Sequence, residues 1–181
     1  MTKTTTITSA YTEDLSPATR AEIIQVCIAA HQEEDFKNLF TYAPTGGWHF
    51  LAYYADKLVS HAGVSTRWLQ VEGQPLLKTA YIDAVATLPT HQGQGYGSAL
   101  MRQLASDIDR EYIIACLETE RETFYERLGW QTWRGPLAGR SEQGLIPTPE
   151  QRGIMVLRLS QTPVLDLDSA LSIECHSDRI W

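Results

Sequence analysis

Hydrophobic residues in the first half of the chain alternate with polar ones over short stretches separated by turn residues. Such alternation predicts half-buried β-strands, because successive side chains of a strand point to opposite faces of a sheet. The pairs Asp56-Lys57 and Glu72-Gly73 predict hairpin turns, which connect antiparallel neighbours. The strands predicted in this half are 7–11, 48–55, 58–68 and 76–85.

One helix interrupts these strands near the start of the chain. Ser16 followed by Pro17 predicts its first turn, because serine caps free N–H groups and proline fits the first helical position. The helix is expected to run to about Ala30, and the acidic connection 31–36 leads toward a short second helix. The inner face of the first helix is predicted to carry Ile23, Ile24, Cys27 and Ile28.

The order of elements changes in the second half of the chain. The predicted elements are a helix at 98–108, a strand at 113–117, a helix at 122–128 closed by Gly129, a strand at 130–134, a loop at 135–153 and a strand at 154–159. The whole pattern predicts an α/β (α+β) fold with one central, mixed and mostly antiparallel sheet flanked by helices. We expect a single domain, 1–181, with 160–181 as an ordered C-terminal extension.

A run of alternating glycines follows the strand that ends at Val85. Glycines let a backbone approach a ligand closely, and a helix that starts after them offers N–H groups suited to phosphate. A Walker loop is excluded because no lysine follows Gly97, and the spacing does not fit the G-x-G-x-x-G dinucleotide fingerprint. The pattern Q/R-x-x-G-x-G/A, which binds pyrophosphate in the GCN5-related N-acetyltransferases (GNAT), is filled by Gln92, Gly95 and Gly97. The alternative is a glycine-rich turn without a ligand.

Composition narrows the classes of partner. The 181 residues carry a formal net charge of -7 and no basic run, so we expect no nucleic-acid partner. An acidic surface suits a cationic substrate, although it also serves solubility alone. The chain has no apolar run that could cross a bilayer, and its start lacks an apolar signal core, so no membrane partner and a cytoplasmic location are expected.

Cysteines and histidines do not suggest a metal site. The three cysteines, Cys27, Cys116 and Cys175, lie far apart in apolar surroundings and are predicted to be buried thiols. The five histidines show no metal-ligand spacing with them, so no metal is expected.

Several stretches spread along the chain carry a family resemblance. They are Asp35-Phe36, Gly46-Gly47, Tyr81-Ile82-Asp83-Ala84-Val85-Ala86, Gln92-Gly93-Gln94, Leu128-Gly129-Trp130, Trp133-x-Gly135-Pro136, Thr148-Pro149, Cys175 and Ile180-Trp181. In these stretches the chain resembles the GNAT superfamily and, within it, the aminoglycoside 2'-N-acetyltransferases. The resemblance implies a GNAT-like fold, acetyl-CoA as donor, an aminoglycoside amine as acceptor, antibiotic resistance as the result, and a homodimer.

The resemblance also implies roles for individual residues. Asp83 would act as base toward the acceptor amine, through a water because it is shorter than the family's usual glutamate, and Tyr125 would act as acid toward the leaving thiolate. The alternative for Asp83 is a strand-end carboxylate without chemistry, and for Tyr125 a core aromatic. The backbone of Val85, Ala86 and Thr87 would pair with the pantetheine arm, with the Val85 N–H polarising the acetyl carbonyl. The pyrophosphate would lie on Gln92, Gly93, Gln94, Gly95, Tyr96 and Gly97.

The acceptor side is implied by the same resemblance. The expected substrate contacts are Asp35, Ile82, Asp83, Glu118, Asp178 and the terminal carboxylate of Trp181. Where the family has an acidic cluster after Thr-Pro, this chain has Glu150-Gln151-Arg152, which favours a less cationic drug such as kasugamycin. Two alternatives stay open: a GNAT enzyme for another small amine, such as a polyamine or amino sugar, and a non-catalytic acyl-CoA-binding protein.

Overall fold

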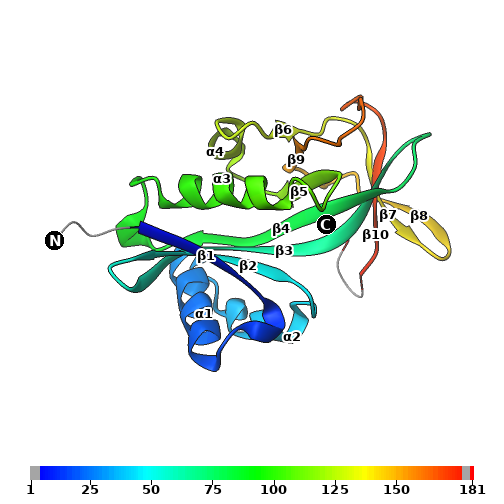
Figure 1. Cartoon of the computed structure of the whole chain (residues 1–181). Coiled ribbons are helices and arrows are strands. Elements are labelled where there is room, and N and C mark those ends of the chain that lie inside the picture. The colour runs from blue at the N-terminus through cyan, green and yellow to red at the C-terminus, as the bar shows by residue number, and fades with distance from the viewer. Residues whose placement is uncertain (1–4, 177–179) are drawn as a thin grey trace. The chain divides into compact units, whose positions relative to one another are not determined.

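The computed structural model describes residues 5–176 and 180–181, and the chain divides into two compact units. The first unit comprises residues 1–65 and 82–107, and the second comprises 66–81 and 108–181. Strands β3 (Lys57–Val71) and β4 (Leu77–Thr87) each contribute one part to either unit. Figure 1 shows the elements of both.

The first unit combines antiparallel strands with helices. β2 pairs with β1 on one side and with β3 on the other, and β4 follows β3 in the sheet. In Figure 1, α1 and α3 lie on opposite faces of these strands. The remaining elements of this unit are β1 (Thr5–Tyr11), η1 (Thr12–Asp14), α1 (Pro17–His31), η2 (Glu34–Asn38), α2 (Leu39–Tyr42), β2 (Trp48–Tyr54), η3 (Pro89–His91) and α3 (Tyr96–Ile108).

Helix α1 begins as the sequence predicts. The Ser16 hydroxyl accepts the backbone N–H of Thr19 at 3.1 Å, which satisfies one N–H of the first turn. The fully buried residues of α1 are Ile23, Val26 and Cys27, whereas the predicted Ile24 and Ile28 are only half-buried. A stripe at i, i+3 and i+4 faces the strands, so the inner face is narrower than the apolar content of α1 suggested.

The turn between β2 and β3 lies one residue earlier than predicted. Tyr54 pairs with Lys57, so Ala55 and Asp56 are the two turn residues, with φ of 48° and 62°. Positive φ at both central positions is the geometry that joins two antiparallel strands in a two-residue hairpin. The prediction of Asp56-Lys57 was therefore wrong by one residue.

The second unit is built on a mixed sheet. Its strand order is β6-β9-β5-β4-β3-β10-β7-β8, in which β10 is parallel to β7 and antiparallel to β3. The additional elements are β5 (Ile114–Glu118), α4 (Glu122–Glu126), β6 (Gln131–Thr132), β7 (Leu137–Ser141), β8 (Gly144–Pro147), β9 (Ile154–Arg158) and β10 (Leu171–Glu174). The predicted mixed α/β sheet flanked by helices is confirmed.

One predicted loop, 135–153, contains a hairpin instead. β7 and β8 pair from Ala138–Pro147 to Ser141–Gly144. Every residue of β8 is exposed, so the hairpin lacks the apolar alternation from which strands are predicted. β7 forms because β10, more than thirty residues later in the chain, supplies a partner strand from Leu171 to Glu174.

The segment after residue 160 contributes to the core of the second unit. Leu165, Leu167, Leu171, Ile173 and Trp181 are all at most 7% exposed and pack with apolar residues of β3, β5 and β9. The single-domain organisation with 160–181 as an ordered extension stays a prediction. Among residues 5–176 and 180–181, none of the helices has the length and apolarity that a bilayer crossing requires.

Candidate active site

A backbone distortion marks β4 at the position of the predicted base. Ala84 has φ of +51°, an unusual value for a residue other than glycine. The carboxylate Oδ1 of Asp83 accepts the backbone N–H of Ala84 at 2.8 Å. Asp83 itself is half-buried. Unusual backbone conformations of this kind persist only where the surrounding structure holds them in place, and they cluster at functional sites.

Side chains of the first unit bind four consecutive carbonyls after this distortion. Each donor is an imidazole, hydroxyl or amide group, and each carbonyl oxygen has a second lone pair for another partner. Side chains of the first unit thus fix the orientation of this segment. The bonds are His61 Nδ1 to Ala84 O (2.8 Å), His31 Nε2 to Val85 O (3.1 Å), Ser60 Oγ to Ala86 O (2.8 Å) and Gln92 Nε2 to Thr87 O (3.0 Å).

The glycine loop joins this segment to α3. Gly93 and Gly95 have φ of 72° and 89°, and a Cβ at either position would meet no atom within 4 Å. Open space in front of such a loop fits a bound phosphate group. α3 starts at Tyr96, two residues earlier than predicted, so Gly97 lies in its first turn. The thirteen-residue helix directs its free N–H groups and positive dipole end toward the loop.

His31 links the predicted substrate contact Asp35 to β4. Asp35 is exposed in η2, and its neighbour Phe36 stacks on the His31 ring with centroids 4.8 Å apart. The same imidazole donates to Val85 O. His31 therefore connects η2, which carries Asp35, to the backbone of β4 at Val85, whereas Ile82 of the same strand is buried. Sequence reasoning missed His31, whose only local signal is its place in the last turn of α1.

Tyr125, the predicted acid, belongs to the second unit. It lies on α4 and is buried, with its ring edge-on to Phe124 at 4.9 Å and to Trp130 at 5.9 Å. Burial raises the pKa of Tyr125 to about 12, although the charge of Arg121 acts in the opposite direction. The phenol therefore stays protonated at neutral pH and can donate a hydrogen bond.

Glu118 ends β5 and is exposed, as a substrate contact requires. Its Oε1 accepts the side-chain amide of Gln151 at 2.7 Å. Gln151 is the middle residue of Glu150-Gln151-Arg152, the stretch that differs from the family's acidic cluster. The Arg152 guanidinium donates to the carbonyls of Pro149 and Gln151 in its own loop.

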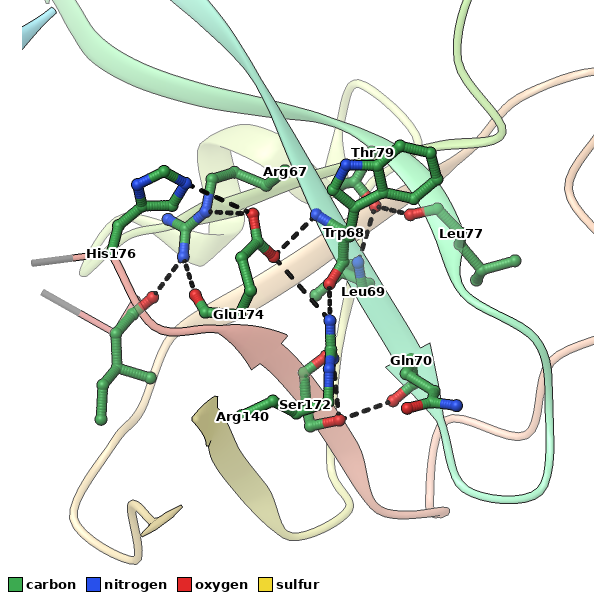
Figure 2. A network of polar contacts seen from close by, with 11 residues as sticks. Arg67, Trp68, Leu69, Gln70, Leu77, Thr79, Arg140, Ser172, Glu174 and His176 are labelled. Atoms are coloured by element: carbon green, nitrogen blue, oxygen red, sulfur yellow. Dashed lines mark hydrogen bonds and ion pairs between the residues drawn. The ribbon is translucent and has the colours of Figure 1, made fainter. Parts of the chain in front are cut away.

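The last residues are held by a buried arginine. Arg67 Nε donates to Glu174 Oε1 at 2.9 Å (Figure 2). Arg67 Nη2 donates to Ile180 O at 2.8 Å. The Trp181 side chain is 3% exposed, and its indole N–H donates to Thr148 Oγ1 at 3.0 Å. The ring of Trp181 is thus a core group, and only its terminal carboxylate remains a predicted substrate contact. Asp178 lies outside the described residues.

The cysteines are free thiols. Cys27 and Cys116 are buried as predicted, whereas Cys175 is half-buried, which corrects the expectation for that residue. Burial is the main cause that raises the pKa of Cys27 to about 12, and Asp83 adds to it. Within the part of the chain that the structure describes, no group of three His, Cys, Asp or Glu side chains could hold a metal ion.

Comparison with known proteins identifies the architecture around this strand and loop. The family model of the acetyltransferase (GNAT) domain matches residues 13–133, which include β4, the glycine loop and Tyr125. The chain belongs to the GNAT acetyltransferase family. We therefore describe β4, the loop and α3 as parts of a GNAT domain.

Individual relatives extend this comparison. An aminoglycoside 2'-N-acetyltransferase from Mycolicibacterium fortuitum is 29% identical over 177 residues, which are 94% of this chain and 89% of that protein. Eis1 from Mycobacterium abscessus has a TM-score of 0.61 and 25% identity over 75% of this chain, which spans about a third (32%) of the Eis1 chain. A GNAT family N-acetyltransferase (YhbS) from Escherichia coli in complex with CoA has a TM-score of 0.66 and 14% identity over 94% of this chain and 89% of its own, which supports the fold.

Proposed function

We propose that this GNAT protein transfers the acetyl group of acetyl-CoA to the 2'-amine of an aminoglycoside antibiotic. The observation that carries the proposal is the distorted segment of β4, where Asp83 binds the N–H of Ala84 four residues before the strand ends at Thr87, ahead of the glycine loop. The similarity to the M. fortuitum enzyme supports the choice of acceptor.

Backbone groups would hold the donor substrate. Val85, Ala86 and Thr87 would pair with the pantetheine arm, and the segment from Gln92 to Gly97 would bind the pyrophosphate at the start of α3. The Val85 N–H would polarise the acetyl carbonyl. The open space at Gly93 and Gly95, where a Cβ would meet no atom within 4 Å, supports this assignment of the loop.

Asp83 would accept the proton that the acceptor ammonium must lose before its nitrogen can attack. A carboxylate has about four lone-pair sites, so Asp83 can accept this proton through a bridging water while Oδ1 holds the Ala84 N–H. The new N–C bond then forms as the C–S bond of the thioester breaks. Tyr125 would donate a hydrogen bond to the leaving thiolate. Because a phenol with a pKa of about 12 is a weaker acid than the thiol of coenzyme A, the thiolate would finally take its proton from solvent.

The acceptor site would consist mainly of carboxylates, since aminoglycosides are polycations. We assign it Asp35, Ile82, Asp83, Glu118, Asp178 and the Trp181 carboxylate. Gln151 occupies one acceptor atom of Glu118, and Arg152 adds a positive charge nearby in sequence. Both features favour kasugamycin, which presents a single 2' amine, over gentamicin or tobramycin.

One assay tests the reaction and the acceptor together. Thiol release from acetyl-CoA is measured with kasugamycin, gentamicin, tobramycin, a polyamine and an amino sugar, and the acetylated nitrogen of the product is located by NMR. We expect the highest kcat/KM with kasugamycin and acetylation of its 2' nitrogen. Turnover of gentamicin alone would contradict kasugamycin, turnover of polyamines alone would favour another small-amine enzyme, and CoA binding without transfer would favour a binding protein.

Two variants test the catalytic roles. Asp83→Asn keeps an oxygen for the Ala84 N–H but removes the base, so kcat should fall about 100-fold or more. Tyr125→Phe should lower kcat by about tenfold or more through loss of the donor. Asp56→Asn, in the exposed β2–β3 turn, is the matched control and should retain full activity. Wild-type rates in both site variants would remove these two roles.

Resistance and a homodimer stay predictions from the family resemblance, and a cytoplasmic location stays a prediction from the apolar pattern of the sequence. Expression in a kasugamycin-sensitive bacterium should raise the inhibitory concentration, and Asp83→Asn should abolish that increase. Light scattering of the purified protein measures the number of subunits.

A further inference from the structure

Two buried histidines in the first unit form a hydrogen-bonded chain that ends at the distorted residue of β4. His49 is 4% exposed and His61 is fully buried. The Thr12 hydroxyl lies 3.0 Å from His49 Nε2, His49 Nδ1 lies 2.9 Å from His61 Nε2, and His61 Nδ1 lies 2.8 Å from Ala84 O. None of these three side chains has a part in the proposed chemistry.

The Ala84 carbonyl, the last acceptor, determines the direction of every hydrogen bond between Thr12 and Ala84. A carbonyl oxygen can only accept, so the proton of His61 must reside on Nδ1. In a neutral imidazole the other nitrogen then accepts, so His49 donates from Nδ1 and accepts the Thr12 hydroxyl at Nε2. One pair of neutral tautomers therefore satisfies all three hydrogen bonds, and it directs the single Thr12 hydroxyl proton to His49 Nε2 and not to the Gly47 carbonyl 3.1 Å away.

Groups packed around the imidazoles keep them neutral. The Arg20 guanidinium donates to Thr12 O at 2.6 Å and lies over the Phe40 ring, which is tilted against His49. Burial and then Arg20 lower the pKa of His49 to about 4, and burial and then His49 lower the pKa of His61 to about 3. Cys27 Sγ lies 3.8 Å from both His61 Nδ1 and Ala84 O, and its raised pKa keeps it an uncharged thiol.

The hydrogen-bonded chain from Thr12 to Ala84 is unsuited to carrying a proton to a substrate. One end is the Ala84 carbonyl, and at the other end Thr12 Oγ1 lies 3.1 Å from the carbonyl of Gly47. Neither carbonyl can pass on a proton. The two histidines instead supply a fixed hydrogen-bond donor, His61 Nδ1 on β3. This donor binds the Ala84 carbonyl, which the positive φ of Ala84 directs toward β3.

We propose that His61, oriented by His49, is a positioning residue that holds the Ala84 peptide in its distorted conformation and so orients the Asp83 carboxylate. The inference rests on the proposed function, because it takes Asp83 as the base. The link is direct: the Ala84 carbonyl is bound by His61, and the Ala84 N–H is bound by Asp83 Oδ1. The carbonyl and the N–H belong to the two peptide units on either side of the Ala84 Cα, so loss of the donor frees the Ala84 dihedral angles and with them the N–H that Asp83 accepts.

Two substitutions at His61 separate the donor from the bulk of the ring. His61→Asn places an amide N–H2 near the position of Nδ1 and keeps the donor, whereas His61→Leu keeps apolar volume and removes it. We expect His61→Leu to lower kcat about tenfold or more while KM for acetyl-CoA changes less than about twofold, because the glycine loop is untouched. His61→Asn should retain kcat within about threefold of the wild type.

A rescue and a stability control complete the test. Ala84→Gly in the His61→Leu background should restore much of kcat, because glycine adopts positive φ without strain. Ile23→Val removes one buried methyl group from α1 and should leave kcat unchanged, which separates lost stability from lost positioning. Wild-type kcat in His61→Leu, or equal loss in His61→Leu and His61→Asn, would overturn the inference.

A measurement without substrate distinguishes this inference from the proposed function. Nitrogen-15 NMR of the wild-type protein should show both histidines as neutral Nδ1–H tautomers at pH 7, with a slowly exchanging proton on His61. An Nε2–H tautomer of His61 would refute the inference even if His61→Leu fails to fold. Absence of acetyl transfer to any amine, with the expected tautomers present, would refute the proposed function instead and remove the catalytic part of the inference with it.

Discussion

Replacement of Arg67 by methionine should destabilise the second unit by about 3 kcal/mol. The side chain of Arg67 is 9% exposed and donates to Glu174 Oε1, Glu174 O and Ile180 O, with its guanidinium 5.2 Å from the Tyr81 ring centre. Removing one partner of a buried ion pair costs about 3–5 kcal/mol. Glu174 is 25% exposed and keeps the Trp68 N–H at 2.8 Å, which lowers the cost toward the bottom of that range.

Urea unfolding followed by circular dichroism measures this change, and the melting temperature should fall by about 6–12 °C. Arg134→Met is the matched control, because Arg134 binds Asp168 through two hydrogen bonds but both side chains are more than half exposed (57% and 62%). That variant should lose less than about 1 kcal/mol. If both variants lost the same stability, or Arg67→Met less than about 1 kcal/mol, burial would not explain the strength of the Arg67 contacts.

Three further predictions concern the glycines and the buried imidazoles. Gly95→Ala, at φ of 89°, should raise KM for acetyl-CoA several-fold with little change in kcat, and an unchanged KM would argue against the loop as the pyrophosphate site. Gly135→Ala should cost about 3 kcal/mol or more in the free energy of unfolding, because a Cβ would lie 1.9 Å from the Ser169 carbonyl oxygen; wild-type stability in urea would contradict this close approach. His49 and His61 have folded-state pKa values of about 4 and about 3, below the unfolded value of 6.5, so the unfolded chain binds more protons as pH falls below 6.5. Stability should therefore fall by about 2 kcal/mol per imidazole between pH 7.5 and pH 5, and a weaker pH dependence in His61→Asn, measured by urea unfolding, would assign the loss to this pair.

Local signals were sufficient for the elements that carry their own pattern. Ser16 and Pro17 placed the start of α1 because capping and proline geometry depend on neighbouring residues alone. The glycine loop was found for the same reason, since positive φ at Gly93 and Gly95 is the conformation that glycine adopts most readily. The resemblance to the GNAT family followed from this loop, and the family match confirmed it.

Pairing between segments far apart in the sequence forms the elements that the sequence pattern does not predict. The β7–β8 hairpin has no apolar alternation, and β7 gains its second partner only from β10 near the end of the chain. The ring of Trp181 is a core group that bonds Thr148, a contact between residues 33 positions apart. No local rule connects such residues, because their proximity is a property of the folded sheet.

The sequence by itself determined the family and the glycine loop, which depend on residue types at short spacing, and it predicted the mixed sheet from the order of its elements. Only the tertiary structure showed that Ala84 adopts positive φ and that His61 binds its carbonyl from β3. Nothing in the residue type of Ala84 predicts that conformation, since alanine disfavours it. The conformation exists because buried donors from distant positions in the chain converge on one peptide, and that convergence arises only when the chain has folded.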